Sequence, residues 1–293
     1  MSCYTSFVYI LHIFKRPWVY RSLGIFCILC VACVATLTLP HFIGTPSNER
    51  DWSLDQAVLP HAIVEGNTIQ VFNIRNFSYV STSTYTPSYY DKTYDLEALT
   101  RVWYAVEPFP GIPGSAHTFL SFEFSTGDFL AISVETRKEK EELFHPIKGL
   151  FNQYELMYVI GDERDLVKLR TNYREDPVYL YPAKASPEMA RKLFVDMLTK
   201  ATALKEKPEF YNTLTNNCTS NIVHHINDLY PDRISPFTLS ILFPENSDRL
   251  AYELGLLDTT LPFPEARTYF HINDRALRYA DDPDFSHKIR QSE

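Results

Sequence analysis

Apolar and polar residues alternate roughly along residues 67–74, as in a β-strand, and several short segments further along the chain are predominantly apolar. These segments are rich in aromatic and branched side chains and comprise residues 67–74, 117–124, 129–135, 154–160 and 178–181. Residues 125–128 (STGD) have the composition of a turn, so the second and third segments form a predicted β-hairpin. We therefore predict an antiparallel or mixed sheet at the centre of an α+β fold.

Two helices are predicted after these strands. Ser186 offers a hydroxyl cap, Pro187 suits the first helical position, and Glu188 favours the positive end of the helix dipole. Apolar residues then continue at helical spacing to about Lys205. A second apolar series with a period of 3.6 residues starts at Cys218 and ends before the next proline. Cys218 is therefore expected in the first turn of a helix that packs against the sheet.

Two segments lack either period. Residues 81–94 are rich in Ser, Thr and Tyr, and we predict a loop there that could border a groove. Residues 107–114 (EPFPGIPG) hold too many Pro and Gly residues for a helix or a central strand. This segment breaks the chain just before His117.

Residues 22–39 (SLGIFCILCVACVATLTL) contain no charged side chain. As a helix rising 1.5 Å per residue, they come close to the hydrocarbon thickness of a bilayer. Lys15, Arg16 and Arg21 precede this segment, whereas the first arginine after it is Arg50. Because basic flanks stay in the cytoplasm, the pattern predicts a single N-terminal membrane span with the rest of the chain on the outer side.

This topology divides the chain into two parts. Residues 1–41 form the predicted cytoplasmic segment and membrane anchor, and residues 42–293 form one extracytoplasmic domain with a catalytic core at about 100–230. The alternatives for the apolar segment are a signal peptide cleaved after Ala35 and a buried core helix. The formal net charge of −8 offers no broad positive field for phosphates, so nucleic acid is not an expected partner.

The distribution of cysteines points to one residue. Four of the five lie in the N-terminal segment and one lies in the predicted outer domain; they are Cys3, Cys27, Cys30, Cys33 and Cys218. No disulfide can form within that domain, and an unpaired thiol in an oxidising compartment risks oxidation. Cys218 is either a small buried apolar residue or a residue kept for its chemistry.

The position of Cys218 favours chemistry. At a helix N-terminus the free backbone N–H groups stabilise a thiolate over a thiol, which activates a nucleophile. The same groups can hold the negative oxygen of a tetrahedral intermediate. The candidate substrate-binding or oxyanion residues are Ser133, Arg137, Asn217 and Thr219.

His117 is the candidate base, because it follows the Pro/Gly break and opens an apolar strand. A hairpin of this length brings Glu135 near His117 as the residue that orients the imidazole, with Ser133 as the alternative. His225 is a rival base, since it lies seven residues after Cys218 and on nearly the same helix face. A structural histidine at a sheet end is the competing interpretation of His117.

Other site types receive little support. Arg137, Arg164 and Arg170 are interpreted chiefly as ion pairs or as the rim of a site. The sequence has no HExxH motif, no cysteine pair after residue 41 and no glycine-rich phosphate loop. We therefore expect neither a metal nor an organic cofactor.

With these residues in hand, the chain resembles the family named for the N-terminal periplasmic domain of the lipoprotein N-acyltransferase Lnb. The stretches that carry the resemblance are residues 73–77 (NIRNF), 116–122 (AHTFLSF), 132–137 (ISVETR), 154–156 (YEL), 162–165 (DERD) and 208–219 (PEFYNTLTNNCT). The Asn217-Cys218 helix start is also similar to that of lecithin-retinol-acyltransferase-like enzymes. Both resemblances imply a circularly permuted papain-like (NlpC-like) thiol enzyme in which histidine precedes cysteine.

The resemblance implies acyl transfer at a bacterial inner membrane, with the catalytic domain in the periplasm. Cys218 would take a fatty acyl chain from a lipoprotein or lipid as a thioester, and His117 would be the base. One alternative is a papain-like cysteine hydrolase or amidase of the cell envelope, because water can replace the amine acceptor. The other is a non-catalytic envelope module in which Cys218 merely packs.

Overall fold

Residues 24–31, 44–231 and 233–291 are described by a computed structural model. The chain divides into two compact units, Met1–Thr45 and Pro46–Glu293. Residues 24–31 form a helix with exposed side chains, whereas the other residues of the predicted span 22–39 and the predicted boundary after residue 41 lie outside the described residues. Within the described parts of the chain, no helix is both long and apolar enough to cross a membrane.

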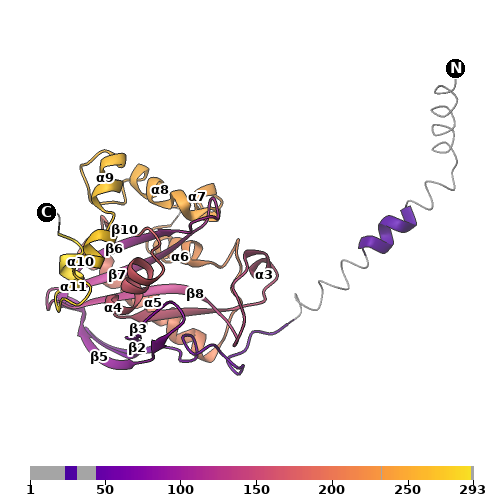
Figure 1. The fold of residues 1–293 in the computed structure, drawn as a ribbon, viewed down its shortest axis with the longest axis horizontal. Helices are drawn as coiled ribbons and strands as arrows, with labels where there is room; N and C mark the ends of the chain where they lie inside the picture. The colour runs from indigo at the N-terminus through magenta and orange to yellow at the C-terminus, as the bar shows by residue number, and fades with distance from the viewer. Residues whose placement is uncertain (1–23, 32–43, 232, 292–293) are drawn as a thin grey trace, which may run out of the picture. The chain divides into compact units, whose positions relative to one another are not determined.

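The larger unit is built on a mixed eight-stranded sheet with the strand order β1-β2-β9-β8-β7-β6-β10, in which β5 also pairs with β2 (Figure 1). The strands are β1 (His61–Glu65), β2 (Thr68–Arg75), β5 (Tyr89–Asp95), β6 (Leu99–Pro108), β7 (Ala116–Phe124), β8 (Phe129–Arg137), β9 (Glu155–Gly161) and β10 (Tyr179–Pro182). Only β2 and β9 run parallel. The five predicted strands, the β7–β8 hairpin and the mixed sheet are confirmed.

A separate two-stranded ribbon consists of β3 (Ser78–Tyr79) and β4 (Tyr85–Thr86). The helices are α3 (Pro146–Leu150), α4 (Glu163–Lys168), α5 (Pro187–Glu206), α6 (Cys218–Leu229), α7 (Leu239–Leu242), α8 (Ser247–Glu253), α9 (Phe263–Tyr269), α10 (Asn273–Arg278) and α11 (Phe285–Lys288). Short turns of 3₁₀ or π type are η1 (Leu96–Ala98), η2 (Leu169–Tyr173) and η3 (Pro244–Asn246).

The two predicted helices are confirmed as α5 and α6, and their caps explain where they begin. The Ser186 side chain accepts a hydrogen bond from the backbone N–H of Met189 at the start of α5. At the start of α6, the Asn217 side chain accepts from the N–H of Ser220, whose hydroxyl accepts in turn from the N–H of Asn217. Such reciprocal capping satisfies helix donors that otherwise lack partners.

The prediction of a loop over residues 81–94 is wrong for its second half, which belongs to β5. Tyr90, Lys92 and Tyr94 point inward in alternation with exposed neighbours, and β5 pairs antiparallel with β2. Tyr94 packs its ring against Phe124. Tyrosines and the stem of a lysine provide enough apolar surface for a strand face, so the polar composition concealed the alternation.

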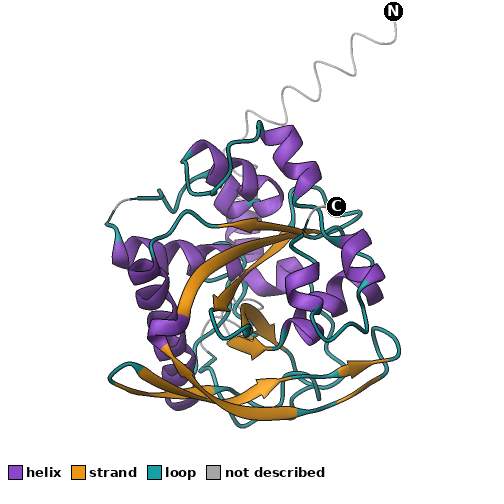
Figure 2. Cartoon of the chain, turned by 90° about the vertical axis from the view of Figure 1, so that its left-hand side faces the viewer, coloured by secondary structure: helices purple, strands orange, loops and turns teal. Residues whose placement is uncertain are grey.

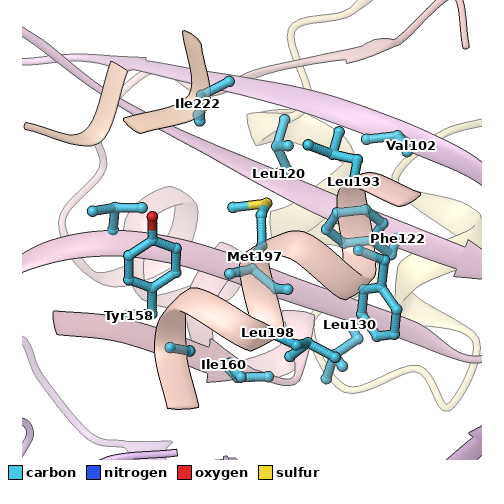
Figure 3. Packing of buried hydrophobic residues seen from close by; sticks show 14 of the residues in the cluster. Val102, Leu120, Phe122, Leu130, Tyr158, Ile160, Leu193, Met197, Leu198 and Ile222 are labelled. Carbon is cyan, nitrogen blue, oxygen red and sulfur yellow. The ribbon is translucent and has the colours of Figure 1, made fainter. Parts of the chain in front are cut away.

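Helices cover both faces of the sheet, as the strands in orange and helices in purple show in Figure 2. On one face α5 and α6 enclose the larger core; in Figure 3, Leu193, Met197 and Leu198 of α5 lie against Phe122, Leu130 and Ile160 of the strands. On the other face, side chains of α4, α10 and α11 form the second core. Burial on both faces explains why the central strands are almost continuously apolar.

One buried ion pair joins strand β2 of this sheet to α4. The guanidinium of Arg75, at the end of β2, donates two hydrogen bonds of 2.9 Å to the carboxylate of Asp165. That carboxylate also accepts from the backbone N–H of Phe77 and from the hydroxyl of Tyr79, both at 2.8 Å. The side chains of Arg75 and Asp165 are only 5% and 0% exposed, so neither charge has water to replace its partner.

We expect Asp165→Ala to destabilise the protein by about 3–5 kcal/mol, because it leaves the Arg75 charge buried and unpaired. Denaturant unfolding followed by circular dichroism measures this change. Glu188→Ala is the matched control, since it removes the carboxylate of an exposed pair with Lys192 and should leave the midpoint nearly unchanged. Equal midpoints for the two variants would contradict the structural role of Asp165.

Candidate functional site

A cleft opens where two central strands part. The ladder between β7 and β8 ends at the pair Phe119–Ser133. Beyond it, β7 stays paired with β6 as far as Ala116, and β8 stays paired with β9 as far as Arg137. The two strands are therefore held by their outer neighbours and not by each other, which opens the sheet at this end.

The cleft has a volume of about 170 Å³. Its strand residues are Ala116 and His117 from β7 and Val134, Glu135 and Thr136 from β8. The other residues that line it are Asp55, Gln56, Phe109, Lys138, Phe144, Arg170, Arg174, Tyr211 and Cys218. Three predicted catalytic residues, Cys218, His117 and Glu135, thus meet in one cavity although they come from separate elements.

Cys218 is the first residue of α6, as predicted, and its side chain is buried. Because Asn217 and Ser220 cap each other, the Asn217 side chain is engaged in the cap. Among the residues that the structure describes, the backbone N–H groups of Cys218 and Thr219 have no acceptor. These two donors are free to bind the oxygen of an acyl group held by Cys218.

A buried polar network fixes the first turn of α6. The hydroxyl of Tyr158 on β9 donates to Asn221 Oδ1 at 3.1 Å, and Asn221 Nδ2 donates to the carbonyl of Asn217 at 2.8 Å. The same hydroxyl lies 2.7 Å from Nε2 of His225, whose Nδ1 lies 2.6 Å from Asp196. His225, the rival base in the sequence, is thus engaged within this network and is not among the residues that line the cleft.

A direct contact brings the neighbours of the two principal residues together. Thr118, next to His117, and Thr219, next to Cys218, have their hydroxyls 3.0 Å apart, which ties β7 to α6 across 101 positions of sequence. Because successive strand residues point to opposite faces, His117 lies on the face opposite Thr118, near the ring of Phe119. Cys218 and His117 therefore reach the cleft from the two faces of the parted sheet.

No hydrogen bond joins the Cys218 thiol to the His117 imidazole, both of which the structure describes. Catalytic hydrogen bonds often form only when the substrate is bound. The shared cleft places both residues in the wall of one cavity, and proton transfer between them requires a movement that brings the two side chains into contact.

His117 is oriented by a chain of polar groups. Its Nε2 lies 2.6 Å from the hydroxyl of Ser133, and that hydroxyl donates to Glu135 Oε1 at 2.9 Å. Arg170, from η2, donates to the same Glu135 oxygen at 2.8 Å and to Glu107 at 2.7 Å. Glu135 and Ser133, the two predicted alternatives for orienting the histidine, thus act in series in this arrangement.

The charges along this series of polar side chains determine the protonation state of each side chain. Burial alone would raise the pKa of Glu135, but the positive charge of Arg170, with a smaller effect of His117, holds that pKa well below its usual range. The carboxylate can then only accept, so the Ser133 hydroxyl donates to Glu135 and accepts from Nε2–H of His117. Nδ1 of His117 is left with a free lone pair.

The imidazole is neutral over the whole physiological range. Burial and the positive charge of Arg170 lower the pKa of His117 to about 3. Among the described residues, Nδ1 of His117 has no hydrogen-bond partner. A neutral imidazole with one oriented donor and one free lone pair can accept a proton, but a base with a pKa of about 3 does not hold the proton of a resting thiol near pH 7, so transfer to it belongs to the transition state.

The predicted arginines are found in three different places. Arg137 donates to the carbonyls of Gln56 and Ala57 and stacks over Trp52, so its guanidinium binds the segment before β1 and does not line the cleft. Arg164 lies at the surface beside Asp162. Arg170 lines the cleft.

Arg170 forms ion pairs, as the sequence analysis expected of it; its side chain is 2% exposed and contacts Glu107 and Glu135 at once. The identity of its partners was not predicted. A signal in the sequence is lacking, because both carboxylates lie on other strands, more than 30 positions away. In the described residues, no group of three or more His, Cys, Asp or Glu side chains is placed to hold a metal ion.

Comparison with protein families matches residues 85–245 to the model described as the Lnb N-terminal periplasmic domain. This range is more than half of the 293 residues and contains β6, β7, β8, α6 and every residue that lines the cleft except Asp55 and Gln56. Comparison with curated proteins and comparison with solved structures each gave no match.

The first prediction from this geometry concerns the reactivity of the thiol. We expect iodoacetamide to modify Cys218 at pH 7 about tenfold or more faster in the wild-type chain than in His117→Ala, because the imidazole accepts the thiol proton as the sulfur attacks. Mass spectrometry of the peptide that contains Cys218 separates its labelling from that of the N-terminal cysteines. His61→Ala, which removes a histidine on β1, is the control, and equal rates in all three proteins would exclude a functional pair.

The second prediction concerns stability against pH. The pKa of His117 is about 3 in the folded chain and about 6.5 when unfolded, so the unfolded state binds the proton first as the pH falls. Between these values His117 should lower the free energy of unfolding by up to about 1.4 kcal/mol per pH unit of acidification. His117→Gln should lose this component, and denaturant titrations from pH 7.5 to 4.5 measure it. If the free energy of unfolding fell with pH equally in the wild type and in His117→Gln, that result would contradict a buried neutral imidazole.

Proposed function

Because this chain belongs to the family of the Lnb N-terminal periplasmic domain, we propose that it is a cysteine-dependent acyltransferase of the bacterial cell envelope. It moves a fatty acyl chain from a lipid or lipoprotein donor to an amine through a thioester on Cys218. One observation carries the proposal: a cysteine with two free backbone N–H donors shares a cleft with a neutral, oriented imidazole. The family description makes the matched region a periplasmic domain.

In the first half-reaction the Cys218 sulfur attacks the carbonyl carbon of the donor ester while Nδ1 of His117 takes up the thiol proton. The carbonyl oxygen becomes negative and is held by the N–H groups of Cys218 and Thr219. When the intermediate collapses, the bond to the donor oxygen breaks, and the imidazolium returns the proton to the leaving alcohol. Thioester and free alcohol are the products.

In the second half-reaction an amine attacks the thioester carbonyl. His117 accepts a proton from the amine, the carbon–sulfur bond breaks, and the thiolate of Cys218 leaves and is reprotonated by the imidazolium. The product is an amide. During both halves, the Glu135 carboxylate stabilises the transient imidazolium through the hydroxyl of Ser133.

The fold supports a permuted papain-like assignment. In papain-like enzymes a cysteine at a helix N-terminus faces a histidine on a strand of an antiparallel sheet. Here α6 packs against β7 and β8, and the histidine strand precedes the cysteine helix in the chain. That order of elements is the one expected of a permuted papain-like domain.

The N-terminal apolar segment completes the proposal. As a membrane anchor over residues 22–39, it would hold the periplasmic domain at the outer surface of the inner membrane, where lipid and lipoprotein substrates reside. Both substrates and enzyme would then diffuse in two dimensions at the same surface.

A hydrolase is the second candidate, and the openness of the cleft favours it. Charged side chains such as Asp55, Lys138 and Arg174 line the cleft together with Cys218 and His117, and such a polar lining suits the entry of water to the thioester. Hydrolysis would release a free acid instead of an amide. Product analysis with and without a lipopeptide amine distinguishes the two activities.

The test of the main proposal is to trap the acyl-enzyme. The full chain in phospholipid vesicles is treated with a diacylated lipopeptide, quenched in acid and analysed by mass spectrometry. We expect the mass of one acyl chain on the Cys218 peptide, its removal by hydroxylamine, and its absence in Cys218→Ser. His117→Ala should acylate at least about 100-fold more slowly. Amide formation without any acylation of Cys218 would contradict the thioester mechanism.

If the protein is instead a non-catalytic envelope module, no acylation of Cys218 is expected. If Cys218 only packs, Cys218→Ser should alter thermal stability slightly and leave any envelope phenotype unchanged beyond that loss. Measuring the unfolding temperature and the activity of the same variant separates these outcomes.

A further inference from the structure

A second cavity, of about 120 Å³, lies on the other side of α6 from the polar network and is almost wholly apolar. Its walls come from β6, β7, α5, α6 and the segment around α8. Figure 3 shows four of the wall residues along the upper side of the core, namely Val102, Leu120, Leu193 and Ile222.

The cavity follows the length of α6. Wall residues on this helix recur from Thr219 to Tyr230, which at 1.5 Å per residue is a distance of about 16 Å. Thr219 is the immediate neighbour of Cys218 and shares its helix turn. The wall of the cavity therefore includes the residue that follows the nucleophile, whereas Cys218 itself lines the polar cleft.

The chemistry of the walls selects the class of ligand. Nearly all the wall surface is aliphatic, and the two tyrosines, Tyr104 and Tyr230, are the only aromatic residues that line it. The Tyr104 hydroxyl already donates to Ser247, so it presents no free polar group to the cavity. Such a wall offers no partner to a sugar, a peptide or a nucleotide, whereas an alkyl chain needs none.

A void of this size requires an explanation, since protein interiors are close-packed and retain few spaces larger than a water molecule. An engineered apolar cavity of about 150 Å³ stays dry and binds benzene. This cavity is similar in size and lining, so water would fill it poorly and a hydrocarbon would fill it well.

One charged group stands at the border of the cavity. Lys184 lines it and is exposed, and within the described residues its ammonium group has no ion-pair partner. An unpaired ammonium next to an aliphatic channel suits the carboxylate or phosphate of a lipid. The combination is that of an amphiphile site with an apolar interior and a cationic rim.

The segment that closes the cavity lies outside the family match. Ser247, Leu250, Ala251, Leu254 and Leu257 all follow residue 245, at which the matched region ends. The catalytic cleft lies within the matched region or beside it, but this wall is built by the C-terminal segment. The cavity is thus not accounted for by the matched domain alone.

We propose that this cavity binds part of one aliphatic chain of the lipid on which the Cys218 site acts. The inference rests on the proposed acyl transfer for the identity of the lipid, and on the cavity alone for the binding of an alkyl group. A cavity of about 120 Å³ holds a short stretch of that chain against α6, and Lys184 pairs with an anionic group at the surface. Residues 247–257 form one wall of this space and limit how much of the chain enters it.

Photo-crosslinking tests the proposal without requiring turnover. The full chain with Cys218→Ser is placed in vesicles of phosphatidylglycerol that carries a diazirine in one acyl chain, irradiated and digested. We expect crosslinks on peptides from α6 and from residues 247–257. Crosslinks restricted to the N-terminal apolar segment would overturn the proposal.

Variants that fill the cavity sharpen this test. Ala251→Phe and Ala185→Phe each add a ring at a half-buried wall position, and they lie on different segments, so that one can replace the other if it fails to fold. Ala203→Phe makes the same change at an exposed position of α5 and is the control. We expect crosslinking at α6 to fall severalfold in the first two and not in the third. Unchanged crosslinking in both filled variants would contradict the proposal.

The same experiment separates this inference from the catalytic proposal. Crosslinks in the cavity combined with no thioester on Cys218 in the wild-type chain would retain a lipid-binding cavity and reject acyl transfer. A thioester on Cys218 that forms equally well in Ala251→Phe and Ala185→Phe, without crosslinks in the cavity, would reject the cavity and retain acyl transfer.

Discussion

The parting of β7 and β8 beyond the pair Phe119–Ser133 is the constraint on which the site depends. Each strand keeps its hydrogen bonds to its outer neighbour, so the sheet opens without losing its edges. In a closed hairpin His117 and Glu135 would face each other as a cross-strand pair, and no cavity would separate them. Because the strands part, Ser133 bridges the two residues, and the thiol of Cys218 approaches from the other face of the sheet.

The charge of Arg170 then determines the protonation states of the side chains in this opening. Arg170 is fully surrounded by protein, so its charge acts on Glu135 and His117 with little screening by water. It keeps the carboxylate ionised and the imidazole neutral, which fixes the direction of every hydrogen bond between them. The cost of burying Arg170 is offset by two carboxylates, Glu107 and Glu135, each from a different strand.

The helix α6 lines both the polar cleft and the aliphatic cavity. Its first turn presents Cys218 to the polar cleft, while its apolar side forms a wall of the aliphatic cavity. The network of Tyr158, Asn221 and His225 holds this turn in place from a third side. A small rotation of this helix would change the shape of the cleft and of the cavity together. The buried polar contacts at its first turn oppose such a rotation.

The sequence by itself determined the features that depend on neighbouring residues. The cap at Ser186, the helix start at Cys218, the turn between β7 and β8 and the single cysteine after residue 41 are local patterns, and each was readable from a few positions. His117, Glu135 and Ser133 could be named because the hairpin places them near one another. The strand β5 was missed because its inward residues are tyrosines and a lysine.

Only the tertiary structure decided the rest, since it depends on contacts between distant segments. The residues near Arg170 in the sequence do not predict that it pairs with carboxylates of β6 and β8. The residues near His225 likewise do not predict its contact with Tyr158. The Thr118–Thr219 contact that unites the site spans 101 positions. The periodicity of the sequence indicates which face of a helix or strand is buried, but it does not indicate what packs against that face. Only tertiary packing placed the Cys218 thiol and the His117 imidazole in one cleft.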